Sequence, residues 1–425
     1  MLKTLRDAWK VEEIRRRIIF TFLMLVLFRL GNTIPVPFVN TDILAGIFSQ
    51  TQGNLLAFLN LLSGGALGQF SIFALSIYPY ITSSIIIQLL TIAIPQLEEL
   101  SKEGEEGQKK IQYLTKILAV VLAAVQAIGI TNTLFARAIV ANGFLQRMAI
   151  ILVLVAGTMF LVWLSDLITE KGVGNGTSML IFVGIVSRLP STVIAWTQGT
   201  IDGMIHPLKA LLMIAIVLVT VAGVVLINKG ERRIHVQYAK RVVGRKMYGG
   251  QATHIPVKVN MSGVMPVIFA TSLMSLPQIL GFFAGGGVRN FVNKYLSGQM
   301  MPGIIITNII VVVLIIVFAF FYTMIQFNTV EYAKNLQQQG GFIPGIRPGR
   351  PTSEYLSRIA NRITLIGAIA LAILHLLPTI LSAIFGLNIS FGGTSIIIVV
   401  GVILDTINEL DSMLLIRNYK GFLNK

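Results

Sequence analysis

Side chains that could perform chemistry are few in this sequence, and their spacing does not bring them together. No HExxH pair places two histidines on one helix face, as a zinc site needs, and no GxxxxGKS or GxxxxGKT segment can cradle nucleotide phosphates. The GVGNG segment at Gly172 lacks GxGxxG spacing, and the absence of cysteine excludes thiol catalysis. We therefore expect no enzyme activity, no cofactor and no metal site. Any work must be driven from outside the chain. The four scattered histidines are His206, His235, His254 and His375.

Ionisable residues inside apolar segments are the candidates for an ion or proton pathway. They are His375, Asp405 and Glu409. Neither His375 nor Asp405 has an obvious charged partner in the sequence. We therefore favour structural roles over a proton relay. His375 is expected to be a satisfied hydrogen-bond donor between helices, and Asp405 is expected to pack within the protein or to reach the membrane interface.

Neutral polar residues also interrupt the apolar segments. Side chains of this kind join helices inside a bilayer at about 0.6 to 2 kcal/mol per contact. They fit either an ordinary helix bundle or a seam weak enough to open, and the residues alone do not decide between the two. The residues are Gln88, Gln126, Thr271, Ser272 and Ser275.

The composition predicts that transmembrane helices position the polar and ionisable side chains named above. Hydrophobic residues make up 54% of the 425 residues and charged residues only 12%, against about 25% in a soluble domain. The sequence therefore predicts an all-α polytopic membrane protein. Residues 1–17 have the spacing of a helix in the membrane interface. Ten transmembrane helices are predicted at about 18–34, 70–94, 112–135, 146–168, 177–198, 207–227, 262–284, 303–327, 361–384 and 393–415.

The distribution of lysine and arginine predicts the orientation. Most of the 34 basic residues fall in connections on the side of the N-terminus, so both termini are expected in the cytoplasm. The loop at Gly199 divides the chain into halves 1–198 and 199–425 with five helices each. An odd number per half fits two pseudo-symmetric inverted halves, a hypothesis that rests on topology alone.

Two of the cytoplasmic loops are long enough to dock a partner. The loop at 228–261 carries eight basic residues among alternating apolar ones, which predicts a short hairpin. The loop at 328–361 combines a helical piece, Val330 to Gln338, with Gly-Pro turns that hold Arg347 and Arg350 at a tip. For isolated basic residues such as Lys171, the better interpretation is that they set the membrane topology and do not dock a partner.

A short apolar segment precedes the second predicted helix. Leu55 to Leu62 is far below the roughly 20 residues that cross a bilayer, whereas Phe70 to Ile94 is long enough. Gly64, Gly65 and Gly68 break the helix between them. A broken segment is tolerated only inside protein or beside a watery cavity, so we expect a re-entrant half-helix at 54–64.

Five motifs together resemble the bacterial SecY family, whose members are the large subunit of a protein-conducting channel. The resemblance extends over nearly the whole chain, with the motifs in order. They are SGGALGQFSIFALSIYPYITSSIIIQLL, GTMFLVWLSDLITEKGVGNGTSMLIF, YAKRVVGRKMYGGQATHIPVKVNMSGVMPVIFA, GGFIPGIRPGRPT and FGGTSIIIVV.

The resemblance implies a closed pore with a plug and an apolar ring. The plug corresponds to Leu55, Leu56, Phe58, Leu59, Leu61 and Leu62. The ring corresponds to Ile77, Ile81, Ile181, Ile268 and Ile398. Where the family often has a sixth apolar residue, this sequence has Thr177. Either the ring is less complete here, or Met179 or Leu180 compensates.

The resemblance also implies a lateral gate and docking sites. The gate lies between the second and third helices and the seventh and eighth, at Thr82, Gln88, Gln126, Thr271, Ser272 and Leu276. The cytoplasmic loops dock the motor ATPase SecA or the ribosome through Lys240, Arg241, Arg245, Lys246, Arg347 and Arg350. Basic side chains suit ribosomal RNA phosphates and an acidic protein patch equally well.

The expected function is a passive channel in the bacterial cytoplasmic (inner) membrane. Unfolded secretory polypeptides pass through it, and apolar segments leave sideways into the lipid bilayer. The small membrane subunits SecE and SecG are its expected partners. The alternative is a secondary transporter of a small solute, which also uses broken helices and inverted repeats. A transporter needs a polar site at the midplane with ligands for a coupling ion, and the sequence shows no such set.

Overall fold

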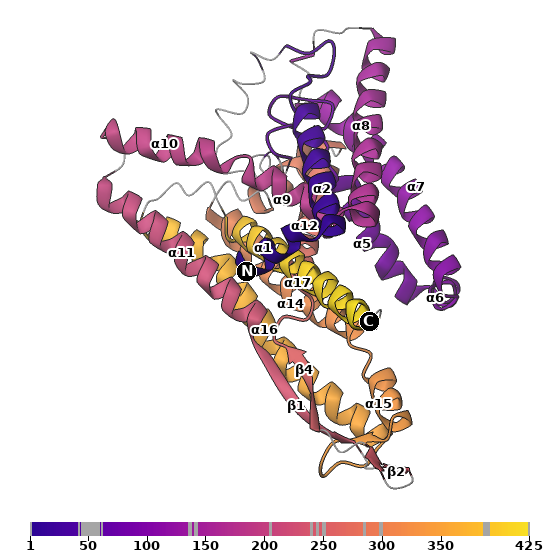
Figure 1. Cartoon of the computed structure of the whole chain (residues 1–425). Helices are drawn as coiled ribbons and strands as arrows, with labels where there is room; N and C mark the ends of the chain where they lie inside the picture. The colour runs from indigo at the N-terminus through magenta and orange to yellow at the C-terminus, as the bar shows by residue number, and fades with distance from the viewer. Residues whose placement is uncertain are drawn as a thin grey trace. The chain divides into compact units, whose positions relative to one another are not determined.

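The chain is mostly helical and folds as two compact units in a computed structural model. The described residues are 2–40, 43, 60, 63–134, 138–139, 143–203, 206–238, 241–243, 246–248, 252–283, 286–296, 301–385 and 392–423 (Figure 1). The first unit comprises Met1–Ala210, Thr271–Ile310 and Val402–Lys425, and the second comprises Leu211–Ala270 and Val311–Gly401. These boundaries do not follow the predicted halves 1–198 and 199–425, which stay a prediction.

Each of the ten predicted spans overlaps a helix. Seven helices of the described residues are long and apolar enough to cross a membrane, or eight if the bent pair α5 and α6 is one span. The number of crossings therefore stays a prediction. The helices are α1 Leu2–Lys10, α2 Glu12–Gly31, α5 Tyr78–Ala93, α6 Pro95–Lys102, α7 Glu105–Gly129, η1 Ile130–Leu134, α8 Phe144–Lys171, α9 Gly176–Val186, α10 Leu189–Ile201, α11 Pro207–Lys229, α12 Met265–Phe283, α13 Gly286–Tyr295, α14 Met301–Gln326, α15 Thr329–Gln338, α16 Arg350–Phe385 and α17 Gly393–Leu423.

The second span begins later than predicted. Residues 63–77 form consecutive turns, and α5 starts only at Tyr78. Phe70 and Ser76 have positive φ, which a helix does not allow, and Pro79 occupies the first turn of α5, where its missing N–H costs nothing. Backbone hydrogen bonds with the segment after α2 take the place of helical ones. Val36 N donates to Phe70 O at 2.9 Å, and Ile72 N donates to Ile34 O at 3.0 Å. The expected helix at Phe70 to Ile77 is therefore wrong.

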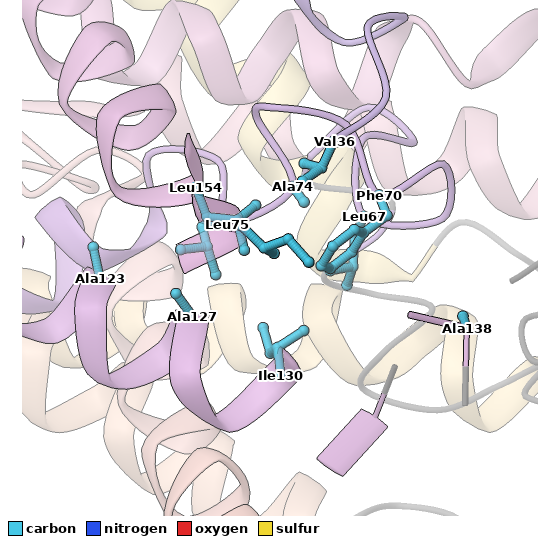
Figure 2. Packing of buried hydrophobic residues seen from close by; sticks show 11 residues of the cluster. Val36, Leu67, Phe70, Ala74, Leu75, Ala123, Ala127, Ile130, Ala138 and Leu154 are labelled. Carbon is cyan, nitrogen blue, oxygen red and sulfur yellow. The ribbon is translucent and has the colours of Figure 1, made fainter. Parts of the chain in front are cut away.

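The turns are apolar because they form part of a core. Their buried side chains pack with α7 and α8 of the first unit (Figure 2). Gly157 of α8 lets the backbone of Ile72 approach closely, since an added Cβ at Gly157 meets the Ile72 carbonyl. The buried members of this cluster are Val36, Leu67, Phe70, Ala74, Leu75, Ala123, Ala127, Ile130, Ala138, Ile150 and Leu154.

A small sheet in the second unit joins the two long loops. β1 Glu231–Tyr238 pairs antiparallel with β4 Ala252–Lys258, which confirms the predicted hairpin. On its other edge, β1 pairs with β5 Gly341–Phe342 from the second loop, giving the order β4-β1-β5. The short strands β2 Arg241–Val243 and β3 Lys246–Tyr248 pair with each other.

The joined loops share a hydrophobic core. The inward residues of β1 and β4 alternate with exposed ones, and they pack against α15 and α16. Sequence analysis predicted both loops but not their union. The buried members are Ile234, Val236, Val257, Phe327, Leu336, Ile343, Leu356, Ile359, Ala360 and Ile363.

Replacing Phe70 with alanine tests the packed turns of the first unit. The side chain is 0% exposed, so Phe70→Ala is expected to cost about 3 to 5 kcal/mol, through lost burial and the cavity left behind. Denaturant unfolding in detergent micelles measures the loss. Phe22→Ala is the control, because Phe22 is 65% exposed. Equal losses for the two variants contradict the core position of Phe70.

Candidate functional site

The predicted plug lies outside the described residues at Leu55, Leu56, Phe58, Leu59, Leu61 and Leu62. Asn60 within this segment and the turn that begins at Ser63 are described. The predicted break at Gly64 and Gly65 is present, since both glycines have positive φ. The chain therefore does not continue as one helix into α5.

All five isoleucines of the predicted ring are buried. Ile77, Ile81 and Ile181 belong to the first unit, and Ile268 and Ile398 belong to the second. Ile77 is the N-cap residue of α5, and Ile81 follows one turn later, so both lie on one face of that helix. The ring itself stays a prediction.

Thr177 turns its hydroxyl toward α8. Its Oγ1 lies 2.8 Å from Ser165 Oγ, and Asn175 caps α9 by accepting from Ser178 N at 3.1 Å. The hydroxyl is thus used in fixing α9 on α8. Met179 and Leu180, the residues considered as replacements for the missing apolar residue, are buried in the same helix.

Tyr78 connects α5 with α12 in the first unit. Its hydroxyl lies 2.8 Å from the backbone carbonyl of Ser272 and 3.3 Å from that of Thr271, so one proton is shared between two acceptors. The ring is 7% exposed. The backbone at two predicted gate residues is therefore bonded to the second predicted span, and the gate itself stays a prediction.

Sequence analysis did not select Tyr78. It considered amide and hydroxyl residues inside the spans, whereas the tyrosine stands in an apolar run beside Ile77, a residue of the predicted ring. A buried tyrosine hydroxyl usually finds a hydrogen-bond partner, so a tyrosine inside a span is the signal that could have found it.

The other predicted gate residues bond mainly within their own helices. Thr82 Oγ1 donates to Tyr78 O at 3.1 Å, and Gln88 Nε2 donates to Ser84 Oγ at 3.3 Å. Gln126 is buried in α7, and its amide nitrogen has no hydrogen-bond partner in the part of the chain that the structure describes. Leu276 is half-buried in α12. Tyr78 thus supplies a hydrogen bond between α5 and α12.

Serine and aromatic side chains position the helices that flank this contact. Ser83 Oγ of α5 donates to Thr115 O of α7 at 2.6 Å. In the second unit, Phe269 of α12 packs edge-on against Phe318 and Tyr322 of α14. The second predicted span therefore lies against the third, and the seventh lies against the eighth.

The predicted docking residues lie in the joined loops of the second unit. Arg347 is exposed, and its carbonyl accepts from Thr352 Oγ1 at 2.8 Å. Arg350 begins α16, and its Nε lies 3.0 Å from a carboxylate oxygen of Glu354. Positive φ at Gly345 and Gly349 forms the predicted turns on either side of Arg347.

The remaining docking residues are described less fully. Lys240 and Arg245 lie outside the described residues. Arg241 is in β2 and Lys246 is in β3, where only the backbone is described, and the two strands pair. Their docking role stays a prediction.

His375, one candidate for an ion pathway, has a local partner. His375 Nδ1 lies 2.9 Å from Thr394 Oγ1, which joins α16 to α17 within the second unit. Pro378 has no N–H to donate to the Leu374 carbonyl. The backbone of Gly393, at the start of α17, lies close to this carbonyl, since an added Cβ at Gly393 would meet the carbonyls of Leu374 and His375. Over the described ranges, no three histidine or carboxylate side chains are grouped as a metal site.

Comparison with known proteins decides the family. A family model described as SecY matches residues 71–407. Protein translocase subunit SecY of Aquifex aeolicus (strain VF5) is 42% identical over 433 residues, with 100% of each chain covered. The chain belongs to the SecY family.

Two solved structures share the fold of this SecY-family chain. One, described as "The structure of a protein conducting channel", has a TM-score of 0.67 at 18% identity and covers 93% of this chain and 91% of its own. The other, described as "Sec61 in the Canine ribosome-channel complex from the endoplasmic reticulum", has a TM-score of 0.61 at 17% identity, with the same shares covered. The resemblance inferred from five motifs and the all-α polytopic membrane fold are confirmed.

Removing the Tyr78 hydroxyl tests the contact between α5 and α12. Tyr78→Phe keeps the ring and loses the hydrogen bond, which is worth about 0.5 to 1.5 kcal/mol. We expect a lower disulfide yield between cysteines placed at Thr82 and Leu276 in the cysteine-free chain. Tyr80→Phe is the matched control, because it removes a tyrosine hydroxyl from the same helix that has no bond to the described side chains and backbone of α12. An unchanged yield for Tyr78→Phe contradicts the contact.

Proposed function

We propose that this protein is the channel-forming subunit of a protein translocase in the bacterial cytoplasmic membrane. It passes unfolded polypeptides across the bilayer and releases apolar segments sideways into lipid. The observation that carries the proposal is the full-length match, at 42% identity, to a protein translocase subunit. It favours polypeptide over a small solute and thus argues against the secondary transporter.

A ring of isoleucines fits this task. Branched apolar side chains narrow a pore until it loses water, which blocks ions without a charged filter and binds no particular polypeptide sequence. Leu55 to Leu62 closes the pore as a plug when no polypeptide is present. The resemblance to the family supports the ring at Ile77, Ile81, Ile181, Ile268 and Ile398.

The lateral gate opens between α5 and α12. The shared hydrogen bond of Tyr78 supports this, because it is weak enough to break when a passing segment competes for the seam. A segment of about 18 or more apolar residues is long enough to remain in the bilayer after it leaves. Polar segments pass straight through.

External partners drive the channel and complete it. The chain itself performs no catalysis. SecA or a translating ribosome docks on the joined cytoplasmic loops, and SecE and SecG bind within the membrane. The exposed guanidinium of Arg347 between two glycine turns supports the docking surface, as does the basic charge of both loops. Both termini lie in the cytoplasm, as the distribution of basic residues indicates.

A photocrosslinker at Ile268 tests the channel. We expect it to attach to a secretory polypeptide that is stalled during translocation, because the ring surrounds the passing chain. A crosslinker at Ile309, which is 57% exposed in α14 and faces away from the core, is the matched control. No attachment at Ile268, or equal attachment at both positions, contradicts the pore assignment.

Charge reversal at Arg347 tests the docking surface. Losing a hydrogen bond to a charged group costs about 1.5 to 3 kcal/mol, so Arg347→Glu is expected to weaken SecA binding and motor-driven export about tenfold or more. Membrane insertion of the protein itself should change less. Lys209→Glu makes the same charge change at an exposed site near the start of α11, outside both loops, and is the control. Export at the wild-type rate in Arg347→Glu contradicts docking through this residue.

A further inference from the structure

Two exposed histidines face each other on the small sheet of the second unit. His235 lies in β1 and His254 in β4, and the antiparallel register makes the two residues direct partners (Figure 1). Their Nδ1 atoms are 3.2 Å apart, and their ring centroids are 5.0 Å apart. Sequence analysis treated these histidines as scattered, because they lie 19 residues apart along the chain.

The sheet holds the two rings at a fixed spacing. Its other face is buried, since Ile234 and Val236 of β1 and Val257 of β4 belong to the hydrophobic core shared with α15 and α16. A lone two-stranded hairpin is marginally stable in water, whereas this one is packed on helices and extended by β5. A ligand that needs both rings therefore finds them already in place, which lowers the entropy lost on binding.

The hydrogen bonds of the pair assign its protons. His254 Nδ1 also lies 3.0 Å from Thr253 O. A carbonyl oxygen only accepts, so Nδ1 of His254 carries the proton and Nδ1 of His235 accepts. Moving the His254 proton to Nε2 leaves the ring neutral and frees a second lone pair at Nδ1. Two neutral imidazole nitrogens then face each other, and neutral imidazole is the commonest metal ligand in proteins.

The spacing of the nitrogens suits a metal ion. Zinc binds histidine nitrogen at about 2.0 to 2.1 Å, so two nitrogens of a tetrahedral site lie about 3.3 to 3.4 Å apart. The observed 3.2 Å is close to this value. Arg233 follows on the same face of β1, but its Nη2 lies 2.8 Å from a carboxylate oxygen of Glu231, which offsets the positive charge.

We propose that His235 and His254 bind a divalent transition-metal ion such as Zn²⁺ through their Nδ1 atoms, and that the ion clasps β1 to β4. No third histidine or carboxylate joins them in the part of the chain that the structure describes, so water completes the coordination. This departs from the sequence-based expectation of no metal site, which considered histidine pairs on a helix and not across two strands.

The site itself does not depend on the proposed function, but its consequence for docking does. Arg241 and Lys246, two of the predicted docking residues, lie in the chain between β1 and β4. A bound ion therefore holds together the two strands at the base of the loop that carries these residues.

Titration calorimetry with Zn²⁺ tests the site. The full-length chain in detergent, without a polyhistidine tag, is expected to bind one ion, and it has no cysteine that could compete. His235→Gln and His254→Gln are each expected to lower the affinity at least about tenfold, because a single imidazole cannot chelate. His206→Gln removes an exposed histidine just before α11 and is the matched control. No binding by the wild type, or wild-type affinity in either variant of the pair, overturns the proposal.

X-ray absorption at the zinc edge identifies the ligands. We expect two imidazole nitrogens at about 2.0 to 2.1 Å in the wild type and one or none in the two variants. Mg²⁺ is the chemical control, since it prefers oxygen ligands and should not displace the zinc. A spectrum with oxygen ligands alone shows that zinc binds elsewhere and overturns the assignment.

Amide hydrogen exchange tests the clasp. Zn²⁺ is expected to slow exchange in β1 and β4 severalfold in the wild type and to leave it unchanged in His254→Gln. Exchange in α7, which belongs to the other unit, is the control. No partner or polypeptide is present, so the result is separate from that of the crosslinker at Ile268. Unchanged exchange in β1 and β4 of the zinc-bound wild type overturns the clasp.

Discussion

The structure depends on one constraint, which is that backbone polar groups must be paired inside a membrane protein. Residues 63–77 are largely apolar, but they form turns and no continuous helix. Their backbone is paired instead with Ile34, Val36 and the side chains of Arg29 and Asn32. The short segment at Leu55 to Leu62 can precede a full span only because this irregular stretch is satisfied within the first unit.

Hydrogen bonds at the proposed gate lie both within helices and between them. Thr82 and Gln88 bond within α5, whereas the Tyr78 hydroxyl bonds to backbone carbonyls of α12. Residues 63–77 are held against α7 and α8 by apolar packing and by the close approach of backbone that Gly157 allows. A membrane interface of this kind can separate without exposing many unpaired polar groups.

Hydropathy and loop composition predicted the helices and the β1–β4 hairpin. They could not place the start of α5, because buried turns and buried helix share the same apolar composition at Phe70 to Ile77. The pairing of β1 with β5 was also missed, since it joins residues about a hundred positions apart and Gly341–Phe342 carries no strand pattern. The ring and gate positions came from family resemblance, since an isoleucine in a pore and one in a bundle core look alike in sequence.

The length of α16 adds a consequence for docking. At 36 residues and 1.5 Å per residue the helix is about 54 Å long, against a hydrocarbon thickness of about 30 Å. Its first turns pack against β1, β4 and α15 through Leu356, Ile359 and Ala360. The surface around Arg347 is therefore already ordered, so a partner of the kind proposed for it would lose little conformational entropy to loop ordering.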